Sequence, residues 1–321
     1  MLDTLLAHFL SIDLSLLFFF LGMLAAALRS DLSIPADVSK FLSIFMLLAL
    51  GLKGGHEVRV SSSLDGLLPT LSIGFLFCAI IPTVYFFAFR RWLGLGNATG
   101  VAAAYGSVSA ITFITAVEYL ENEGISSAGY MVAAMAMMEI PAIILALYLY
   151  GRWRASAPST QASWRGILAG KSVVLLLGGF TIGLALNDKS WNSLSPVVVG
   201  SFKGVLAFFL LDLGLLAQNQ IRQALQLKWR ALVLAIAIPL TMGTLAALLL
   251  WVSGIERGNL VLMSALVGSA SYIAAPAAIR ASVPDASPAF YVALPLAITF
   301  PMNVLIGIPY YISLSAWLLG S

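Results

Sequence analysis

Charged side chains are scarce in this chain of 321 residues. Asp, Glu, Lys and Arg make up only 10% of it, against about a quarter of a soluble domain. A single cysteine, Cys78, excludes an intrachain disulfide and a cysteine-based metal cluster. The two histidines, His8 and His56, are too few and too peripheral for a histidine metal site. HExxH, GxxxxGK and Ser/His/Asp patterns are also missing, so the sequence predicts neither an enzyme nor a bound cofactor.

Long apolar runs fill the sequence instead. Apolar residues make up 60% of the chain and the mean hydropathy is +0.98. A helix needs roughly 20 apolar residues to cross a bilayer, and ten segments approach or exceed that length. We therefore predict an all-α integral membrane protein with ten membrane-spanning helices. The expected segments are 12–28, 38–53, 66–89, 98–117, 127–150, 168–186, 196–217, 230–252, 259–279 and 289–318.

The two halves of the chain share features in the same order. Gly106-Ser-Val-Ser109 and Gly268-Ser-Ala-Ser271 each interrupt an apolar segment, the fourth and the ninth. The Gly22–Pro35 stretch corresponds to Gly183–Pro196, Leu50-Gly-Leu52 to Leu213-Gly-Leu215, and Pro141 to Pro301, all at nearly the same spacing. Each half holds an odd number of segments, so the halves should cross the membrane in opposite senses, as in secondary transporters. We expect one repeat at 1–150, a cytoplasmic linker at 151–167 and an inverted repeat at 168–321.

Basic residues in the loops predict the orientation. Lys53, Arg59, Lys189 and Arg257 lie in one set of loops, and about three times as many basic residues lie in the opposite set. The richer set should face the cytoplasm. Both termini should therefore lie outside.

The two tetrads are the strongest candidates for a binding site. Irregular backbone inside a membrane is tolerated only where it is packed in protein or lines a cavity. A helix that restarts after a break presents free N–H groups and the positive end of its dipole, which suits an anion. The exposed carbonyl groups, with Ser and Thr hydroxyls, suit Na⁺. The alternative is that Gly and Ser only let helices pack closely.

Three charged side chains lie away from the ends of the predicted segments. Glu139, just before Pro141, is a candidate for Na⁺ binding, proton transfer or a purely structural hydrogen bond. Asn303 is its approximate counterpart in the second half. Lys203 could snorkel to the interface, while Asp212 lies deeper and has no assigned role. Glu118 is expected to anchor the end of a segment.

The residues resemble the SbtA-type sodium-dependent bicarbonate transporters along nearly the whole chain. The resemblance rests on several motifs taken together. These are Arg29-Ser-Asp-Leu-Ser-Ile-Pro35, Leu50-Gly-Leu-Lys-Gly-Gly55, Tyr105-Gly-Ser-Val-Ser-Ala110 with Thr112-Phe-Ile-Thr115, Gly268-Ser-Ala-Ser-Tyr-Ile-Ala-Ala-Pro-Ala-Ala-Ile-Arg280, and Thr299-Phe-Pro-Met-Asn303 through Gly307-Ile-Pro309.

The resemblance implies a Na⁺-coupled bicarbonate symporter of the bacterial plasma (inner) membrane that forms a homotrimer. Each protomer would have a core and a gate domain, as in bile-acid-type symporters, with broken helices four and nine crossing in the core. The implied anion-binding residues are Gly106, Ser107, Val108, Ser109, Gly268, Ser269, Ala270, Ser271 and Tyr272. Candidate Na⁺ ligands are Glu139, Thr112, Thr299 and Asn303. A PII-like regulator binds some members, but the linker here is about twenty residues, shorter than in those members, which puts such regulation in doubt.

The residues alone leave other functions open. Paired helix ends could equally hold a carboxylate, as in a Na⁺-coupled organic-anion symporter. A Na⁺/H⁺ exchanger would need a titratable carboxylate inside the membrane, and Glu139 is the obvious one. A scaffold or sensor would not explain matched interruptions in both halves.

Overall fold

The computed structural model describes residues 14–60, 66–154, 171–227 and 229–320, and every regular element in these ranges is a helix. The elements are α2 (Leu14–Ala27), α3 (Ala36–Val60), α4 (Leu67–Leu93), α5 (Leu95–Gly106), α6 (Ala110–Asn122), α7 (Tyr130–Met138), α8 (Pro141–Trp153), α10 (Lys171–Ala185), α11 (Asp188–Val198), α12 (Phe202–Leu225), α13 (Trp229–Val252), α14 (Arg257–Val267), α15 (Ala274–Ser282), the π-helical turns η1 (Ala289–Ala293), η2 (Pro295–Thr299) and η3 (Asn303–Gly307), α16 (Phe300–Met302) and α17 (Ile308–Leu319).

Seven stretches of this structure are long and apolar enough to cross a membrane. They are Ala36–Val60, Leu67–Leu93, Leu95–Asn122, Tyr130–Trp153, Asp188–Leu225, Trp229–Val252 and Ala289–Leu319. Shorter apolar helices run over Leu17–Ala27, Val174–Ala185 and Arg257–Val267. The predicted all-helical membrane protein is confirmed at this level.

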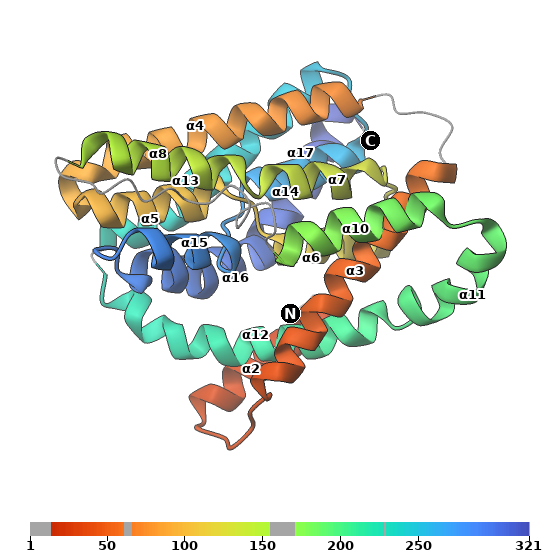
Figure 1. The fold of residues 1–321 in the computed structure, drawn as a ribbon, viewed down its shortest axis with the longest axis horizontal. Helices are drawn as coiled ribbons and strands as arrows, with labels where there is room; N and C mark the ends of the chain where they lie inside the picture. Colours follow the sequence, from red (N-terminus) through yellow and green to blue (C-terminus); the bar gives the residue numbers. More distant parts are fainter. Residues whose placement is uncertain (1–13, 61–65, 155–170, 228, 321) are drawn as a thin grey trace, which may run out of the picture.

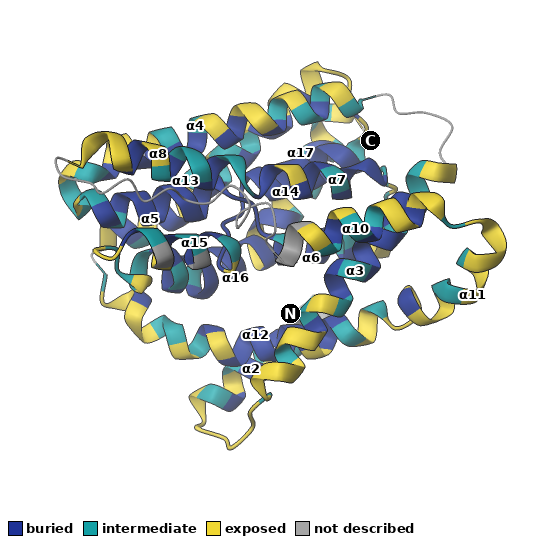
Figure 2. Cartoon of the chain, viewed as in Figure 1, coloured by how far each residue is buried: buried dark blue, intermediate teal, exposed yellow. Residues whose placement is uncertain are grey.

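The helices form two groups (Figure 1). The arm helices are α2, α3, α10, α11 and α12, in which α2 packs along α12 and α3 packs along α10. The other helices form a bundle, in which α4 packs on α5 and α13 packs on α14. Figure 2 shows that the arm helices α2, α11 and α12 have largely exposed outer faces, whereas α5 and α14 lie inside the bundle.

Glycines mark the crossing of α2 and α12. A Cβ atom on Gly22 of α2 would overlap the carbonyl oxygen of Leu211 on α12. In return, a Cβ atom on Gly214 of α12 would overlap the carbonyl oxygen of Phe19 on α2. The two backbones therefore touch at positions that only glycine can occupy, as small residues allow in membrane helices.

The crossing of α3 and α10 repeats this arrangement. A Cβ atom on Gly55 of α3 would overlap the carbonyl oxygen of Phe180 on α10, and one on Gly183 of α10 would overlap that of Leu52 on α3. Gly183 has at this crossing the place that Gly22 has at the other. Gly55 takes the place that corresponds to Gly214, one helical turn beyond the residue that the Leu-Gly-Leu alignment would pair with it.

The predicted end of the second segment, 38–53, is wrong. The glycines from Gly51 to Gly55 do not terminate the helix, because α3 continues to Val60. Their role is close helix contact: Gly51 and Gly55 both meet the α10 backbone. A glycine costs an interior helix about 1 kcal/mol relative to alanine, and tight packing against α10 offsets that cost here.

Both tetrads interrupt helices, as predicted. The fourth segment is broken between α5, which ends at Gly106, and α6, which begins at Ala110. The ninth is broken between α14, which ends at Val267, and α15, which begins at Ala274. The broken fourth segment is also the most buried of the seven long apolar stretches. Of its most apolar part, 89% lies inside the protein, against 29% for α13. Irregular backbone therefore occurs where protein surrounds it.

The fifth and tenth segments are irregular at prolines. The fifth is interrupted at Glu139 and Ile140, between α7 and α8, and Pro141 is the first residue of α8. Proline is favoured at that position because the first amides of a helix have no intrahelical acceptor. The tenth segment contains three π-helical turns, and Pro295 begins the second of them. Such turns interrupt regular α-helix and recur at functional sites.

Candidate binding site between two helix N-termini

Two helices begin side by side where the tetrads end. Ser109 is the N-cap of α6, and its Oγ accepts a hydrogen bond from the Thr112 N–H at 3.2 Å. Ser271 precedes α15, and its Oγ accepts one from the Ala275 N–H at 3.3 Å. Each serine satisfies one amide of a first helical turn and leaves others for a ligand. The positive ends of both helix dipoles lie at the same place.

Hydrogen bonds join the two breaks directly. The Ser109 N–H donates to Ser269 Oγ at 2.8 Å, and the Ser271 N–H donates to the Ala104 carbonyl at 2.7 Å. Ser269 Oγ in turn donates to the Leu266 carbonyl at 2.6 Å. Segments from opposite halves of the sequence are therefore bonded to each other, and backbone groups freed by the breaks find partners in the other half.

Each break is also tied to a neighbouring irregular segment. Ser107 Oγ donates to the backbone carbonyl of Glu139 at 2.7 Å, linking the break of the fourth segment to that of the fifth. Asn303 Nδ2 donates to the Gly268 carbonyl at 2.7 Å, linking the ninth to the tenth. Ser107, within the first break, and Asn303, next to the second, therefore each bond a break to its neighbouring segment.

A cavity of about 60 Å³ lies against the two helix starts. It is lined by Ser43, Leu47, Val108, Ser109, Ala110, Ile111, Glu139, Ser271, Tyr272 and Ile273. Ser109 and Ser271 reach the cavity, whereas Ser107 and Ser269 are used in bonds to the protein. The four tetrad serines therefore divide into two that can contact a ligand and two that support the backbone.

The cavity has an uneven charge distribution. Glu139 contributes a carboxyl group that is 6% exposed, and none of the described lining residues is basic. Opposing this are the two helix N-termini, whose partial positive charge comes from fixed amides. An anion and a cation would each find suitable groups here: amides and hydroxyls for the anion, and carboxylate, hydroxyl and carbonyl oxygens for Na⁺.

The structure does not bring all four predicted Na⁺ ligands to this cavity. Only Glu139 lines it. Thr112 lies in the first turn of α6 next to the cavity residue Ile111, but its side chain is not part of the lining. Thr299 bonds instead to the Ala235 carbonyl at 2.9 Å and to the Tyr105 hydroxyl at 2.8 Å.

Asn303 lies behind the second break rather than in the cavity. Its side chain is 1% exposed, and its Oδ1 has no hydrogen-bond partner among the described residues. A buried amide oxygen without a partner costs free energy. The Asn303 Oδ1 therefore remains available to accept a hydrogen bond or bind a cation close to Gly268.

Sequence reasoning missed the wall opposite the tetrads. Ser43 and Leu47 of α3 close the cavity from the arm group. Ser43 is the polar residue within the otherwise apolar stretch from Phe41 to Leu50, which is the signal that could have pointed to it. The site therefore lies between the arm helices and the bundle, and not within the bundle alone.

Three further charged residues, Lys203, Glu118 and Asp212, form ion pairs or hydrogen bonds with other side chains. Lys203 of α12 forms an ion pair with Glu118 of α6 at 3.0 Å and donates to Asn122 Oδ1 at 3.0 Å. Glu118, expected to anchor the end of a segment, is only 3% exposed. Asp212 of α12 accepts a hydrogen bond from Ser39 of α3.

Gly268→Ala is expected to distort the second break. A Cβ atom there would overlap the Tyr311 hydroxyl, and overpacking of a tight core costs about 1–3 kcal/mol. The melting temperature of purified Gly268→Ala protein should fall, and Tyr311→Phe in the same protein should restore part of it by removing the clashing oxygen. A melting temperature unchanged by Gly268→Ala would contradict this tight packing.

A comparison with protein families shows which family the chain belongs to. The family model of the Na⁺-dependent bicarbonate transporter superfamily matches residues 15–316. The chain belongs to this superfamily. The resemblance in the sequence motifs is thereby confirmed, and Na⁺-dependent bicarbonate transport is the activity of the family. A search of curated proteins found no significant match.

Proposed function

We propose that this protein is a Na⁺-coupled bicarbonate symporter that binds the anion between the N-termini of α6 and α15. The observation that carries the proposal is the small cavity shared by two helix starts, two serine hydroxyls and one carboxyl group. Amides of the first helical turns and the hydroxyls of Ser109 and Ser271 would bind the oxygens of bicarbonate. Helix N-termini are established anion sites for the same reason.

Glu139 supplies a physical reason for coupling to Na⁺. A bicarbonate ion in this cavity would lie close to the Glu139 carboxylate, and two negative charges in a poorly hydrated space repel each other strongly. A Na⁺ ion bound at Glu139 removes that repulsion. Each ion should therefore raise the affinity of the other by the same factor, as thermodynamic linkage requires.

The size of the cavity favours a small anion. A water molecule occupies about 30 Å³ of liquid, so a cavity of about 60 Å³ suits an ion of a few heavy atoms. Sites for drug-sized organic molecules have volumes of about 300–1,000 Å³. A symporter of bulky organic anions therefore fits poorly, although a small carboxylate would not be rejected by size.

A Na⁺/H⁺ exchanger is the other candidate function. Glu139 is the intramembrane carboxyl group that such an exchanger would titrate. The two serine-capped helix starts, however, would have no role in proton exchange. Family membership and the anion-binding geometry together favour bicarbonate symport.

We infer that transport uses alternating access, with the arm helices as gate and the bundle as core. The cavity between α3 and the bundle supports this division, because relative movement there would expose it to one side and then the other. The matching glycine contacts, in which Gly22 corresponds to Gly183 and Gly214 to Gly55, support two inverted repeats. The seven long and three shorter apolar helices support ten spans.

Localisation and assembly follow the family resemblance, and orientation follows the charges of the loops. We place the protein in the bacterial plasma membrane with both termini outside, on the distribution of basic residues, and propose a homotrimer. Most of the linker lies outside the described residues, so a PII-like regulator has no structural support here. Bicarbonate, Na⁺ and membrane lipid are the proposed partners.

Uptake of labelled bicarbonate into proteoliposomes tests this function. We expect accumulation when an inward Na⁺ gradient is imposed and none when choline replaces Na⁺. In bicarbonate-free buffer, the same Na⁺ gradient should leave the internal pH unchanged. Uptake that is indifferent to Na⁺ would contradict coupling, and a Na⁺-driven change of internal pH without bicarbonate would favour the exchanger.

A further inference from the structure

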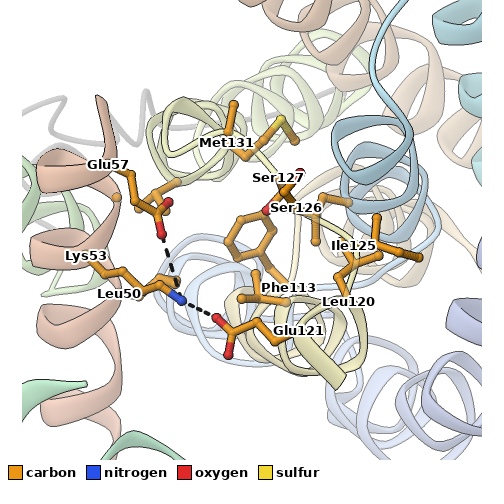
Figure 3. Close-up of a pocket in the computed structure, with 15 residues that line it drawn as sticks. Leu50, Lys53, Glu57, Phe113, Leu120, Glu121, Ile125, Ser126, Ser127 and Met131 are labelled. Carbon is orange, nitrogen blue, oxygen red and sulfur yellow. Dashed lines mark hydrogen bonds and ion pairs between the residues drawn. The ribbon is translucent and has the colours of Figure 1, made fainter. Parts of the chain in front are cut away.

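A second pocket of about 160 Å³ lies beside the bundle, between α3, α6 and the loop 123–129 (Figure 3). In Figure 3, Lys53 and Glu57 extend from α3, and Glu121 faces Lys53 from α6. Apolar side chains, among them Leu50 and Phe113, line the deeper part. We call this pocket the vestibule.

The vestibule and the binding cavity lie along one seam between α3 and α6. On α3, Ser43 and Leu47 line the cavity, and Leu50, Gly54 and Glu57 line the vestibule. Steps of three and four residues keep all five on one face of a helix. The two pockets are therefore successive parts of the same interface.

The α6 side of the seam has the same order. Ala110 lines the cavity, and Phe113, Val117 and Leu120 line the vestibule at helical spacing. Between the pockets, Leu47, Leu50, Ile111 and Phe113 are each at most 4% exposed. An apolar constriction thus separates the vestibule from the binding cavity.

Two lysines of the arm helices hold the far end of α6. Lys53 of α3 is paired with Glu121, and more loosely with Glu57 at 3.9 Å. Lys203 of α12 is paired with Glu118 at 3.0 Å. Positive charge is favoured at a helix C-terminus, so α6 has its anion-binding end in the cavity and its cation-binding end against the arms.

We propose that the α3–α6 seam is the outer access route to the binding cavity and that the Lys53–Glu121 ion pair is the latch that closes it. The ion pair crosses the vestibule from α3 to α6 and joins the two groups that must separate. The apolar constriction below it completes the closure. This inference rests on the proposed function, because the outer side is assigned from the loop charges and the cargo from the cavity.

The latch should be weak enough to open in each cycle. Lys53 and Glu121 side chains are 27% and 38% exposed, and an ion pair with such access to water shifts an equilibrium by about two- to fivefold. A pair of this strength biases the closed state without locking it.

Cysteine labelling tests the latch without relying on transport. Cys78 is replaced by alanine, and Val117→Cys is introduced below the ion pair as a reporter. Reaction with membrane-impermeant methanethiosulfonate reagents is followed from the outside. We expect Lys53→Gln to accelerate labelling of Val117→Cys about two- to fivefold, and Lys53→Arg, which keeps the charge, to leave the rate unchanged.

Two controls separate closure from other effects. Anionic and cationic reagents should both react faster in Lys53→Gln, whereas a change of local potential alone would move their rates in opposite directions. Lys189→Gln, which removes an exposed charge near the same proposed surface, should leave the Val117→Cys rate unchanged. An unchanged rate in Lys53→Gln, or opposite changes for the two reagents, would overturn the latch.

A separate reporter tests the orientation. Ser253→Cys, exposed beyond the end of α13, should react from the outside in every background. If it reacts only in inside-out vesicles, the proposed orientation is wrong. Measuring Val117→Cys in those vesicles then still decides whether the ion pair closes the seam.

Discussion

Ser109→Ala and Ser271→Ala are each expected to weaken bicarbonate binding by about ten- to a hundredfold. Each serine lines the cavity at the start of a helix. A hydrogen bond to a charged ligand contributes about 1.5–3 kcal/mol, and 1.4 kcal/mol is a factor of ten in affinity. The dissociation constant of bicarbonate, measured by calorimetry on purified protein in saturating Na⁺, gives the effect directly.

A matched control is available in the ninth segment. Ser264 is fully buried in α14, and its Oγ donates to the Leu260 carbonyl of the same helix, away from the cavity. Ser264→Ala should leave bicarbonate affinity unchanged. If Ser109→Ala and Ser271→Ala are as silent as this control, the glycines and serines serve only helix packing and the anion site is elsewhere.

The Ser109→Ala/Ser271→Ala double variant tests whether the two halves hold one ion. Independent sites add within about 0.5 kcal/mol, whereas groups that share a ligand do not. We expect the double variant to deviate from the sum of the single effects by more than this. Strict additivity would contradict a shared site.

Glu139→Gln is expected to abolish Na⁺-driven accumulation of bicarbonate. The change removes the charge on which Na⁺ binding and the repulsion between bicarbonate and the protein both depend. The fold should persist, because Ser107 bonds to the Glu139 backbone carbonyl and not to its carboxyl group. Uptake across a range of Na⁺ concentrations, with melting temperature as the measure of folding, checks both expectations.

A stable Glu139→Gln protein with wild-type dependence on Na⁺ would show that Glu139 is structural. Glu139→Asp is the useful companion variant. It keeps the charge on a shorter side chain, so it should retain Na⁺ dependence with a lower Na⁺ affinity. Equal losses in both variants would indicate that shape, rather than charge, is what the site needs.

The positions of the helix breaks were predictable because glycine and serine together in the middle of an apolar segment favour an interrupted helix. Gly106–Ser109 and Gly268–Ser271 stand out on composition alone. These features are local. Backbone chemistry within a few residues decides them, so a sequence pattern is sufficient.

The division of work among the tetrad serines was not predictable. Ser107 and Ser109 are two residues apart and identical in chemistry, yet one bonds to the Glu139 carbonyl and the other lines the cavity. Which of them reaches the cavity depends on how the second break packs against the first. No periodicity within a single segment contains that information.

Partners far apart in the sequence were missed for the same reason. The Lys203–Glu118 pair and the hydrogen bond from Ser39 to Asp212 join the arm helices to the bundle or to each other. The predicted segment 38–53 ended among the glycines Gly51, Gly54 and Gly55, whereas the helix continues to Val60. Gly51 and Gly55 contact α10, which lies in the other half of the chain.

The most direct test of the shared site is the dissociation constant of bicarbonate measured at rising Na⁺ concentration. Because both ions are proposed to bind in one cavity, Na⁺ should lower this constant, and bicarbonate should lower the dissociation constant of Na⁺ by the same factor. In Glu139→Gln protein the bicarbonate constant should no longer change with Na⁺. A wild-type bicarbonate affinity that is the same in Na⁺ and in choline would contradict the shared site.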